Sequence, residues 1–160
     1  MTLGDIRRYM WIIPVLIGLV FVGSGVYTIS EGLAAKDEVR GALVAEQITT
    51  SEDASIPSVL VDSVATARAQ EALITEHTLG SLGPYSSMER DNPDRDTYVT
   101  GVTLRTALNQ AVIGFRVSDL VIGIGAMILV VGLTNIVLMA PVLFWTREGT
   151  PKRAGVMATT

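Results

Sequence analysis

The chain has 160 residues, 49% of them hydrophobic, and a formal net charge of −4 at pH 7. The charge is uneven, because the segment 30–119 holds seven basic and fourteen acidic residues, a net charge of −7. An acidic segment of this kind argues against nucleic acid as a partner. The absence of cysteine excludes disulfides, thiolate metal sites and iron–sulfur clusters.

Two apolar stretches, residues 9–29 and 120–145, contain no Asp, Glu, Lys or Arg. A helix needs about 20 apolar residues to cross a bilayer, so both stretches predict membrane-spanning helices. Tyr9, Trp11 and Tyr27 lie at the two ends of the first stretch, where amphipathic rings favour the membrane interfaces. A cleaved signal peptide is the alternative for this stretch. Its length disfavours that alternative, because a signal-peptide core has about 7–15 apolar residues.

Basic residues flank both predicted spans on the sides away from the acidic segment. They are Arg7, Arg8, Arg147, Lys152 and Arg153. By the positive-inside rule, residues 1–8 and 146–160 are expected in the cytoplasm and residues 30–119 outside. The expected topology is therefore a membrane crossed twice, with both termini cytoplasmic.

Residues 30–47 have no helix breaker stronger than glycine and are expected to continue the first span as helix. Residues 48–60, rich in Ser and Thr, are expected to form a connector with room for a short extended piece. Asp62 or Ser63 is expected to cap an alanine-rich helix that ends at Gly80.

Residues 81–96 contain several Gly and Pro turn signals and predict a loop. After it, Asp96 or Thr97 can cap a helix that enters the second span. Pro141, near the end of that span, is expected to bend or stop the helix. The predicted fold is an all-α membrane protein whose two transmembrane helices form an antiparallel hairpin, extended outside into a small helical domain.

Apolar and small residues recur at alternating spacings of four and three from Gly101 onward, the spacing of a heptad seam. The seam comprises Gly101, Leu104, Leu108, Ala111, Phe115, Ser118, Ile122, Gly125, Leu129, Gly132, Ile136 and Met139. A matching line on the first helix comprises Val15, Gly18, Val22, Gly25, Ile29, Gly32, Ala35, Val39 and Leu43.

Small residues stand seven apart on both lines, and helices in lipid associate through close approach at such residues. In an antiparallel hairpin, equal membrane depth pairs Gly25 with Gly125, Gly18 with Gly132, and Gly32 with Ser118. Two alternatives remain open. Glycine is frequent in membrane helices without a special role, and these faces can also pack against another protein's helices.

Asn135 is the only strongly polar side chain in either span. As an interhelical hydrogen bond it would contribute about 0.6–2 kcal/mol. The alternative is that it lines a polar path, although a pore normally shows more than one polar ring.

Charged residues at the predicted outer membrane surface suggest interfacial ion pairs. Lys36 on the first helix is expected at the height of Arg116 and Asp119 on the second. Glu46 and Arg105 form a second candidate pair farther out. Exposed pairs contribute only about 0–1 kcal/mol, and the same charges can instead meet a partner subunit.

No arrangement of residues predicts a reaction, a metal site or a cofactor. His77 is the only histidine, whereas catalytic zinc or non-haem iron commonly needs two. The sequence has no nucleophile elbow, phosphate loop or dinucleotide fingerprint. The acidic cluster within residues 89–96 lacks the EF-hand spacing and predicts a solvated loop.

Four short segments carry a resemblance to a known family: residues 48–54, 69–70, 76–79 and 103–106. In them the chain resembles a family of small bacterial two-span membrane proteins of unknown function that is common in actinobacteria. The resemblance implies a bacterial plasma membrane and the two-span topology. Members often carry an automatic label as an aromatic ring-opening dioxygenase. One histidine cannot supply the usual iron ligands for that activity.

The expected function is non-enzymatic: an integral membrane accessory or scaffolding subunit. Its expected partners are the lipid bilayer and other membrane protein subunits, or further copies of itself. A small homo-oligomeric channel or transporter component is the alternative. An enzyme with ligands shared between chains is the third hypothesis.

Overall fold

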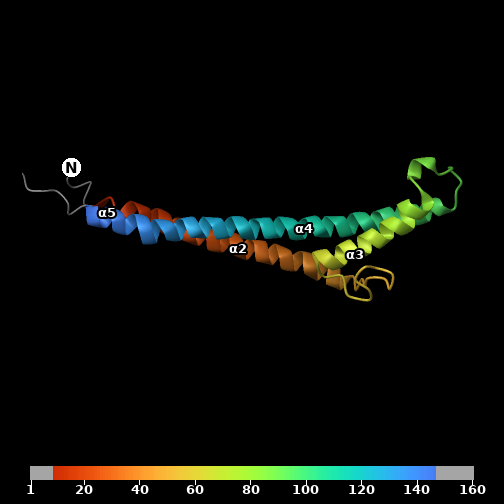
Figure 1. Ribbon diagram of the computed structural model, residues 1–160, viewed down its shortest axis with the longest axis horizontal. Helices are drawn as coiled ribbons and strands as arrows, with labels where there is room; N and C mark the ends of the chain where they lie inside the picture. The colour runs from red at the N-terminus through yellow and green to blue at the C-terminus, as the bar shows by residue number, and fades with distance from the viewer. Residues whose placement is uncertain (1–8, 147–160) are drawn as a thin grey trace, which may run out of the picture. The chain divides into compact units, whose positions relative to one another are not determined.

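The computed structural model describes residues 9–146, and these residues form helices joined by loops (Figure 1). The elements are α2 (Ile12–Ala45), α3 (Val64–Thr75), the π-helix η1 (Glu76–Gly80), the 3-10 helix η2 (Tyr85–Ser87), α4 (Asp94–Thr134), the π-helix η3 (Asn135–Met139) and α5 (Ala140–Thr146). The described residues contain no strand, and their only β-pairing is an isolated antiparallel bridge between Thr49 and Leu60. The all-α class predicted from the sequence is confirmed.

The chain divides into two compact units. Unit 1 comprises the described residues up to Ile29 and from Gly123 onward, and unit 2 comprises Ser30–Ile122. Two helical stretches, Ile12–Ala45 and Asp94–Trp145, are long and apolar enough to cross a membrane. Only 17% and 11% of their most apolar windows are buried, so most of their apolar surface is uncovered.

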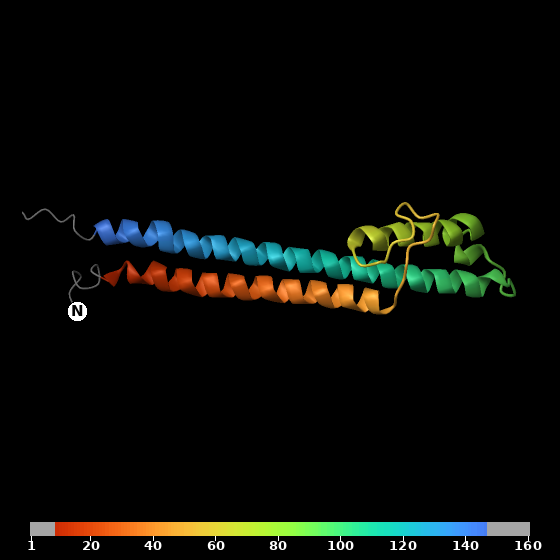
Figure 2. The ribbon, with the colours of Figure 1, turned by 90° about the horizontal axis from the view of Figure 1, so that it is seen from below.

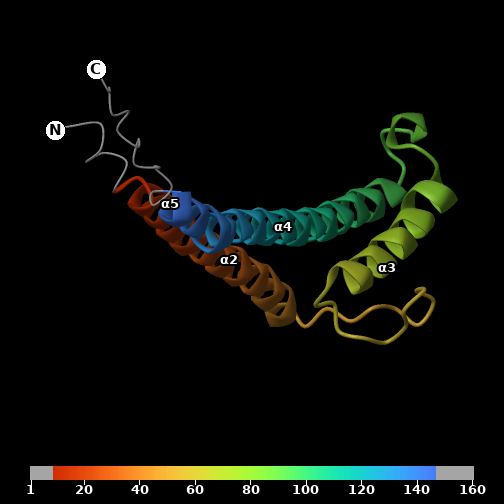
Figure 3. The same cartoon turned by 60° about the vertical axis from the view of Figure 1, so that its left-hand side comes forward.

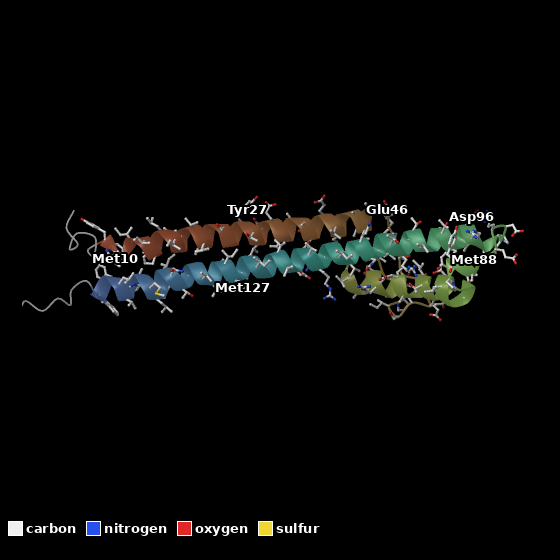
Figure 4. All side chains as sticks on the ribbon, turned by 90° about the horizontal axis from the view of Figure 1, so that it is seen from above. Met10, Tyr27, Glu46, Met88, Asp96 and Met127 are labelled. Carbon is white, nitrogen blue, oxygen red and sulfur yellow. The ribbon has the colours of Figure 1, made fainter. Side chains whose placement is uncertain are left out.

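In unit 1, the parts of α2 and α4 that belong to it lie side by side, as Figures 2 and 4 show from opposite directions. The buried residues of this unit are small or lack a long side chain: Pro14, Gly18, Gly25, Gly125, Gly132 and Ala140. Large residues such as Tyr27 and Met127, labelled in Figure 4, are exposed. At one end of this pair, the Trp11 and Phe144 rings meet edge to face, with centroids 5.7 Å apart.

Unit 2 has a side-chain core, in which α3 and η1 pack against the first part of α4. Its largest fully buried side chains are Phe115, Val61 and Val112. The other buried residues of the same cluster are Leu43, Ala67 and Leu108. Burying apolar side chains is the main source of stability expected for a folded unit in water.

The connector 46–63 is ordered against α3, and Figure 3 shows it passing beside that helix. Ser51 N–H donates to Gln70 Oε1 at 2.9 Å, and Gln70 Nε2 donates to Ser51 Oγ at 3.2 Å. Ala54 packs into a small cluster with Ala69 and Leu73. The short extended piece expected here is the single bridge between Thr49 and Leu60.

The cap of α3 is Ser63, one of the two residues expected from the sequence. Its side chain accepts from Thr66 N–H, and the Thr66 side chain accepts from the Ser63 backbone, which is a reciprocal capping box. The predicted helix end at Gly80 is wrong, because helical structure continues through η1 to residue 82. Gly83, with φ +74° and its N–H bonded to the Leu79 carbonyl at 3.2 Å, is the C-terminal glycine.

The start of α4 also differs from the prediction, which placed the cap at Asp96 or Thr97. The helix begins at Asp94, and the Asn92 side chain accepts from Asp94 N–H at 2.8 Å. Pro93 lies directly before the first helical residue, where a backbone N–H would have no partner within the helix. Asp94 and Asp96 instead occupy the first turn, where acidic side chains interact favourably with the helix dipole.

Pro141 does not stop the last helix, contrary to one of the two outcomes expected from the sequence. The helix continues as α5 to Thr146. The local irregularity lies before Pro141, in the π-helical turn Asn135–Met139. Proline cannot donate to the carbonyl four residues back, and a wider π turn is one way in which a helix accommodates that loss.

The basic residues on which the topology prediction rests lie outside the described residues. They are Arg7, Arg8, Arg147, Lys152 and Arg153.

Candidate functional site

The close contacts between α2 and α4 in unit 1 are centred on glycines. A methyl group at Gly25 would lie 2.7 Å from the backbone N of Leu129 and 2.8 Å from the carbonyl oxygen of Gly125. A methyl at Gly125 would lie 2.9 Å from the backbone N of Ile29. All three distances are too short for real Cβ atoms, so the two backbones approach as closely as glycine permits.

A second close approach joins Gly18 and Gly132. A methyl at Gly132 would lie 2.7 Å from the backbone N of Val22 and 2.8 Å from the carbonyl oxygen of Gly18. A methyl at Gly18 would meet the Ile136 side chain and the Gly132 carbonyl oxygen. We call Gly18, Gly25, Gly125 and Gly132 the glycine contact. It depends on backbone atoms, which cannot move aside as a flexible side chain can.

Two other glycines in the same helices face open space. A methyl at Gly23 or at Gly123 would meet no atom within 4 Å. Each lies two residues from a member of the glycine contact, on a different side of its helix. The chain therefore contains its own control for glycine content: the tight positions are specific and are not a general property of glycine in these helices.

Unit 2 brings together the third predicted small-residue pair and one of the ion pairs. A methyl at Gly32 would lie 3.2 Å from the carbonyl oxygen of Ser118 and 2.7 Å from the Ile122 side chain. Lys36 Nζ lies 2.7 Å from Asp119 Oδ1. Both side chains are partly exposed, which limits the contribution of this pair to stability.

The remaining predicted charge partners are not brought together. Arg116 is exposed and forms no ion pair with any described residue. Glu46 and Arg105 also form no ion pair within the described part of the chain. The sequence indicated their approximate height along the helices, but it did not indicate on which side each would lie.

The heptad seam on α4 holds from Leu108 to Ile136, whose side chain lies against Gly18, but not at Leu104 or Met139. Leu104 is 47% exposed and Met139 is exposed, whereas Val112, off the predicted line, is fully buried. The reason is that α4 has two neighbours in unit 2. Gly114 contacts Val39 of α2, whereas another side of α4 faces α3.

The contact between α4 and α3 involves Gly101. A methyl at Gly101 would overlap with the Thr78 methyl group, so α4 and η1 also approach closely. Gly101 was assigned to the seam that faces α2, and its actual neighbour is η1. The seven-residue spacing in the sequence could not show whether Gly101 faces α2 or η1.

Asn135 does not form the interhelical hydrogen bond expected for it. Its Nδ2 donates to the Val131 carbonyl at 2.9 Å, within its own helix. The neighbouring Thr134 hydroxyl likewise donates to the Val130 carbonyl at 2.8 Å. Asn135 is also the first residue of the π turn, so its bonded amide coincides with the helix irregularity.

The sequence did not predict a cluster that closes the tip of unit 2. Arg95 Nη1 donates to the carbonyls of Met88 and Glu89 at 2.9 and 3.1 Å, and its guanidinium lies 4.3 Å from the centre of the Tyr85 ring. The Tyr85 and Tyr98 rings are 5.7 Å apart. Figure 4 shows Met88 and the start of α4, at Asp96, close together at this tip. The signal for this cluster in the sequence was the three-residue spacing of Arg95 and Tyr98, which places both on one side of a helix.

The described residues contain no group of three or more His, Asp or Glu side chains placed to hold a metal ion. His77 lies in η1, and its side chain is exposed. Comparison of the chain with known protein families, with curated proteins and with solved structures found no match. The geometry alone therefore carries the functional argument.

Proposed function

We propose that this protein is a two-span integral membrane protein whose apolar helices form an antiparallel hairpin, and that it works as a non-enzymatic accessory or scaffolding subunit of a membrane assembly. The observation that carries the proposal is the uncovered apolar surface of two long helices. In a water-soluble protein, an apolar helix of this length would be mostly buried. Lipid is the environment in which such a surface has no cost.

The contacts of unit 1 support the antiparallel arrangement. As residue numbers rise from Gly18 to Gly25 along α2, those of their partners fall from Gly132 to Gly125 along α4. The attraction is of the kind that works in lipid, where apolar side chains gain nothing from leaving the acyl chains and close backbone packing remains. The same contact in water would leave many large apolar side chains exposed.

The orientation follows from the flanking charges. Five basic residues lie in the two short end segments, 1–8 and 146–160, whereas the middle segment 30–119 has a net charge of −7. Both termini are therefore proposed to be cytoplasmic and unit 2 extracytoplasmic. The resemblance to small bacterial two-span proteins is consistent with a bacterial plasma membrane.

The accessory role is supported by what the fold presents. Unit 2 offers a folded surface with an acidic excess, and the described residues include no cluster with the ligands or nucleophile of a recognisable reaction. The channel alternative has less support. Asn135, its main candidate for a polar path, uses its amide within its own helix, which leaves no polar ring in the spans.

Purification of the full chain from native membranes in mild detergent tests the role. Stoichiometric co-purification of other membrane subunits is expected. A pure homo-oligomer that conducts ions in planar bilayers would support the channel instead. The matched variants are Gly25→Ala and Gly23→Ala, because only the first should disturb the hairpin and release the partner.

Cysteine accessibility tests the orientation, since the natural chain has no cysteine. Single cysteines at Ser86, in the tip of unit 2, and at Thr2 should react oppositely with a membrane-impermeant maleimide in intact cells. We expect labelling at Ser86 and none at Thr2. Labelling at Thr2 alone would show the opposite orientation. Labelling at both positions would contradict the proposed hairpin.

A further inference from the structure

Unit 2 contains an apolar groove of about 410 Å³ between the end of α2, α3 and α4. Its walls are formed mainly by Val39, Leu43, Ile74, Ala107, Leu108 and Ala111. All of them belong to unit 2. Leu104, which is exposed, also lines the groove.

Only two side chains lining the groove, Glu46 and Gln70, carry a charge or an amide. Gln70 is engaged through both its oxygen and its nitrogen with Ser51. Glu46, which directly follows α2 and is labelled in Figure 4, is exposed and forms no ion pair or hydrogen bond with the described residues. Its carboxylate is therefore available at the edge of an apolar surface.

The size of the groove favours a small ligand over a protein. Small-molecule pockets measure about 300–1,000 Å³, are mostly apolar and contain few polar groups. A stable protein partner instead buries about 1,200–2,000 Å² in total. A groove of 410 Å³ lies within the first range, and its lining has the expected composition.

The negative charge around the groove favours a ligand with a cationic head group. The free carboxylate belongs to a segment with seven basic and fourteen acidic residues, so a cation is attracted and an anion is repelled. From this complementarity we propose that the groove binds a single-chain amphiphile with an amine head group. Its chain lies against Leu43, Leu108 and Ala111, and its ammonium group meets Glu46. This inference does not depend on the accessory role.

The test uses the full chain in phosphatidylcholine nanodiscs and a photoreactive dodecylamine that carries a diazirine in its chain. Mass spectrometry should locate the label in residues 39–48 and 104–111. Unlabelled dodecylamine should compete, dodecanol should compete more weakly, and dodecanoate should compete least. Labelling spread along the apolar helices of unit 1, or equal competition by dodecanoate and dodecylamine, would overturn the proposal.

Two pairs of variants sharpen this test. Ala107→Trp fills the groove and should abolish the label, whereas Ala45→Trp, exposed and outside the groove, should leave it intact. Glu46→Gln should weaken the binding of dodecylamine about fivefold, the effect of one surface ion pair, and leave the binding of dodecanol unchanged. Glu38→Gln, exposed on α2 outside the groove, should change neither.

The Glu46→Gln arm keeps the proposal testable if Ala107→Trp fails to fold, because Glu46 is exposed and forms no ion pair or hydrogen bond with the described residues. An unchanged dodecylamine affinity in Glu46→Gln would remove the head-group assignment. A photo-crosslink between two protein chains through the groove would assign it to a protein partner and overturn the ligand proposal.

Discussion

The contacts inside unit 1 differ in kind from the contacts inside unit 2. Unit 1 buries glycine, and its closest contacts are between backbones at Gly25 and Gly125. Unit 2 buries side chains, with Phe115, Val61 and Val112 at its centre. The contrast is the one expected if unit 1 lies in lipid, as proposed, and unit 2 in water. In water, burying apolar side chains drives association, whereas in lipid only closer packing remains.

The largest expected effect lies in unit 2, at Phe115, which is 1% exposed. Phe115→Ala should destabilise unit 2 by about 3–5 kcal/mol, because it removes a large apolar side chain and leaves a cavity. Hydrogen exchange followed by mass spectrometry would report this as lost protection in unit 2 peptides. Val117→Ala is the control, since Val117 is 52% exposed and should change little. Equal effects of the two variants would contradict the side-chain core.

The next effect lies in unit 1, where Gly→Ala substitutions two residues apart should differ in their effect on stability. Gly125→Ala should destabilise the helix pair by about 1–3 kcal/mol, because its methyl meets backbone atoms. Gly123→Ala has open space and should be neutral or slightly stabilising.

Tryptophan fluorescence reads unit 1 selectively, because both tryptophans, Trp11 and Trp145, belong to it. Thermal melts in mild detergent should show a lower midpoint for Gly125→Ala alone. If Gly123→Ala lowered the midpoint as much, glycine content and not the contact would explain the pairing.

A smaller effect is expected at the tip of unit 2. Arg95→Met should cost about 1–2 kcal/mol, because it removes two charge-assisted hydrogen bonds to carbonyls and the contact with the Tyr85 ring. Faster trypsin cleavage after Arg90 would report the loosened loop. Arg90→Met is the control for stability, measured by thermal melting, since Arg90 is exposed and has no partner among the described residues. A stable, protease-resistant Arg95→Met would show that the tip does not need this cluster.

The smallest effect is expected for Lys36 and Asp119. A double-mutant cycle with Lys36→Met and Asp119→Asn should give a coupling of about 0–1 kcal/mol, because both side chains are partly exposed. The coupling should shrink as salt is added. A coupling above this range that resists salt would place the pair in a less hydrated environment, which would extend the low-dielectric region into unit 2.

Local chemistry was predictable where one residue acts on its own neighbours. Ser63 was expected as a cap, and the all-helical class followed from the apolar runs. The end of the helical run formed by α3 and η1 was not predicted, because Gly80 and Gly83 are both plausible terminal glycines. Only Gly83 adopts the positive φ that ends the helix.

The neighbours of α4 were less predictable. A heptad line describes one partner, and α4 has two in unit 2, so Leu104 is exposed and Val112 is buried. Asn135 shows the same limit. Its polar side chain predicted a partner across the pair, but the carbonyl four residues earlier in its own helix was closer. The sequence contained no signal for the groove beside Glu46, since the walls of the groove come from three separate helices.

The sequence by itself determined the helical class, the two apolar stretches and the seven-residue spacing of small residues. These properties depend on composition and on the period of a single helix, which the order of residues contains directly. The tertiary structure decided which glycines are in contact, which charges pair and which side of α4 faces which neighbour. Those outcomes depend on the rotation of each helix against others distant in sequence, and several rotations share one period until packing selects among them.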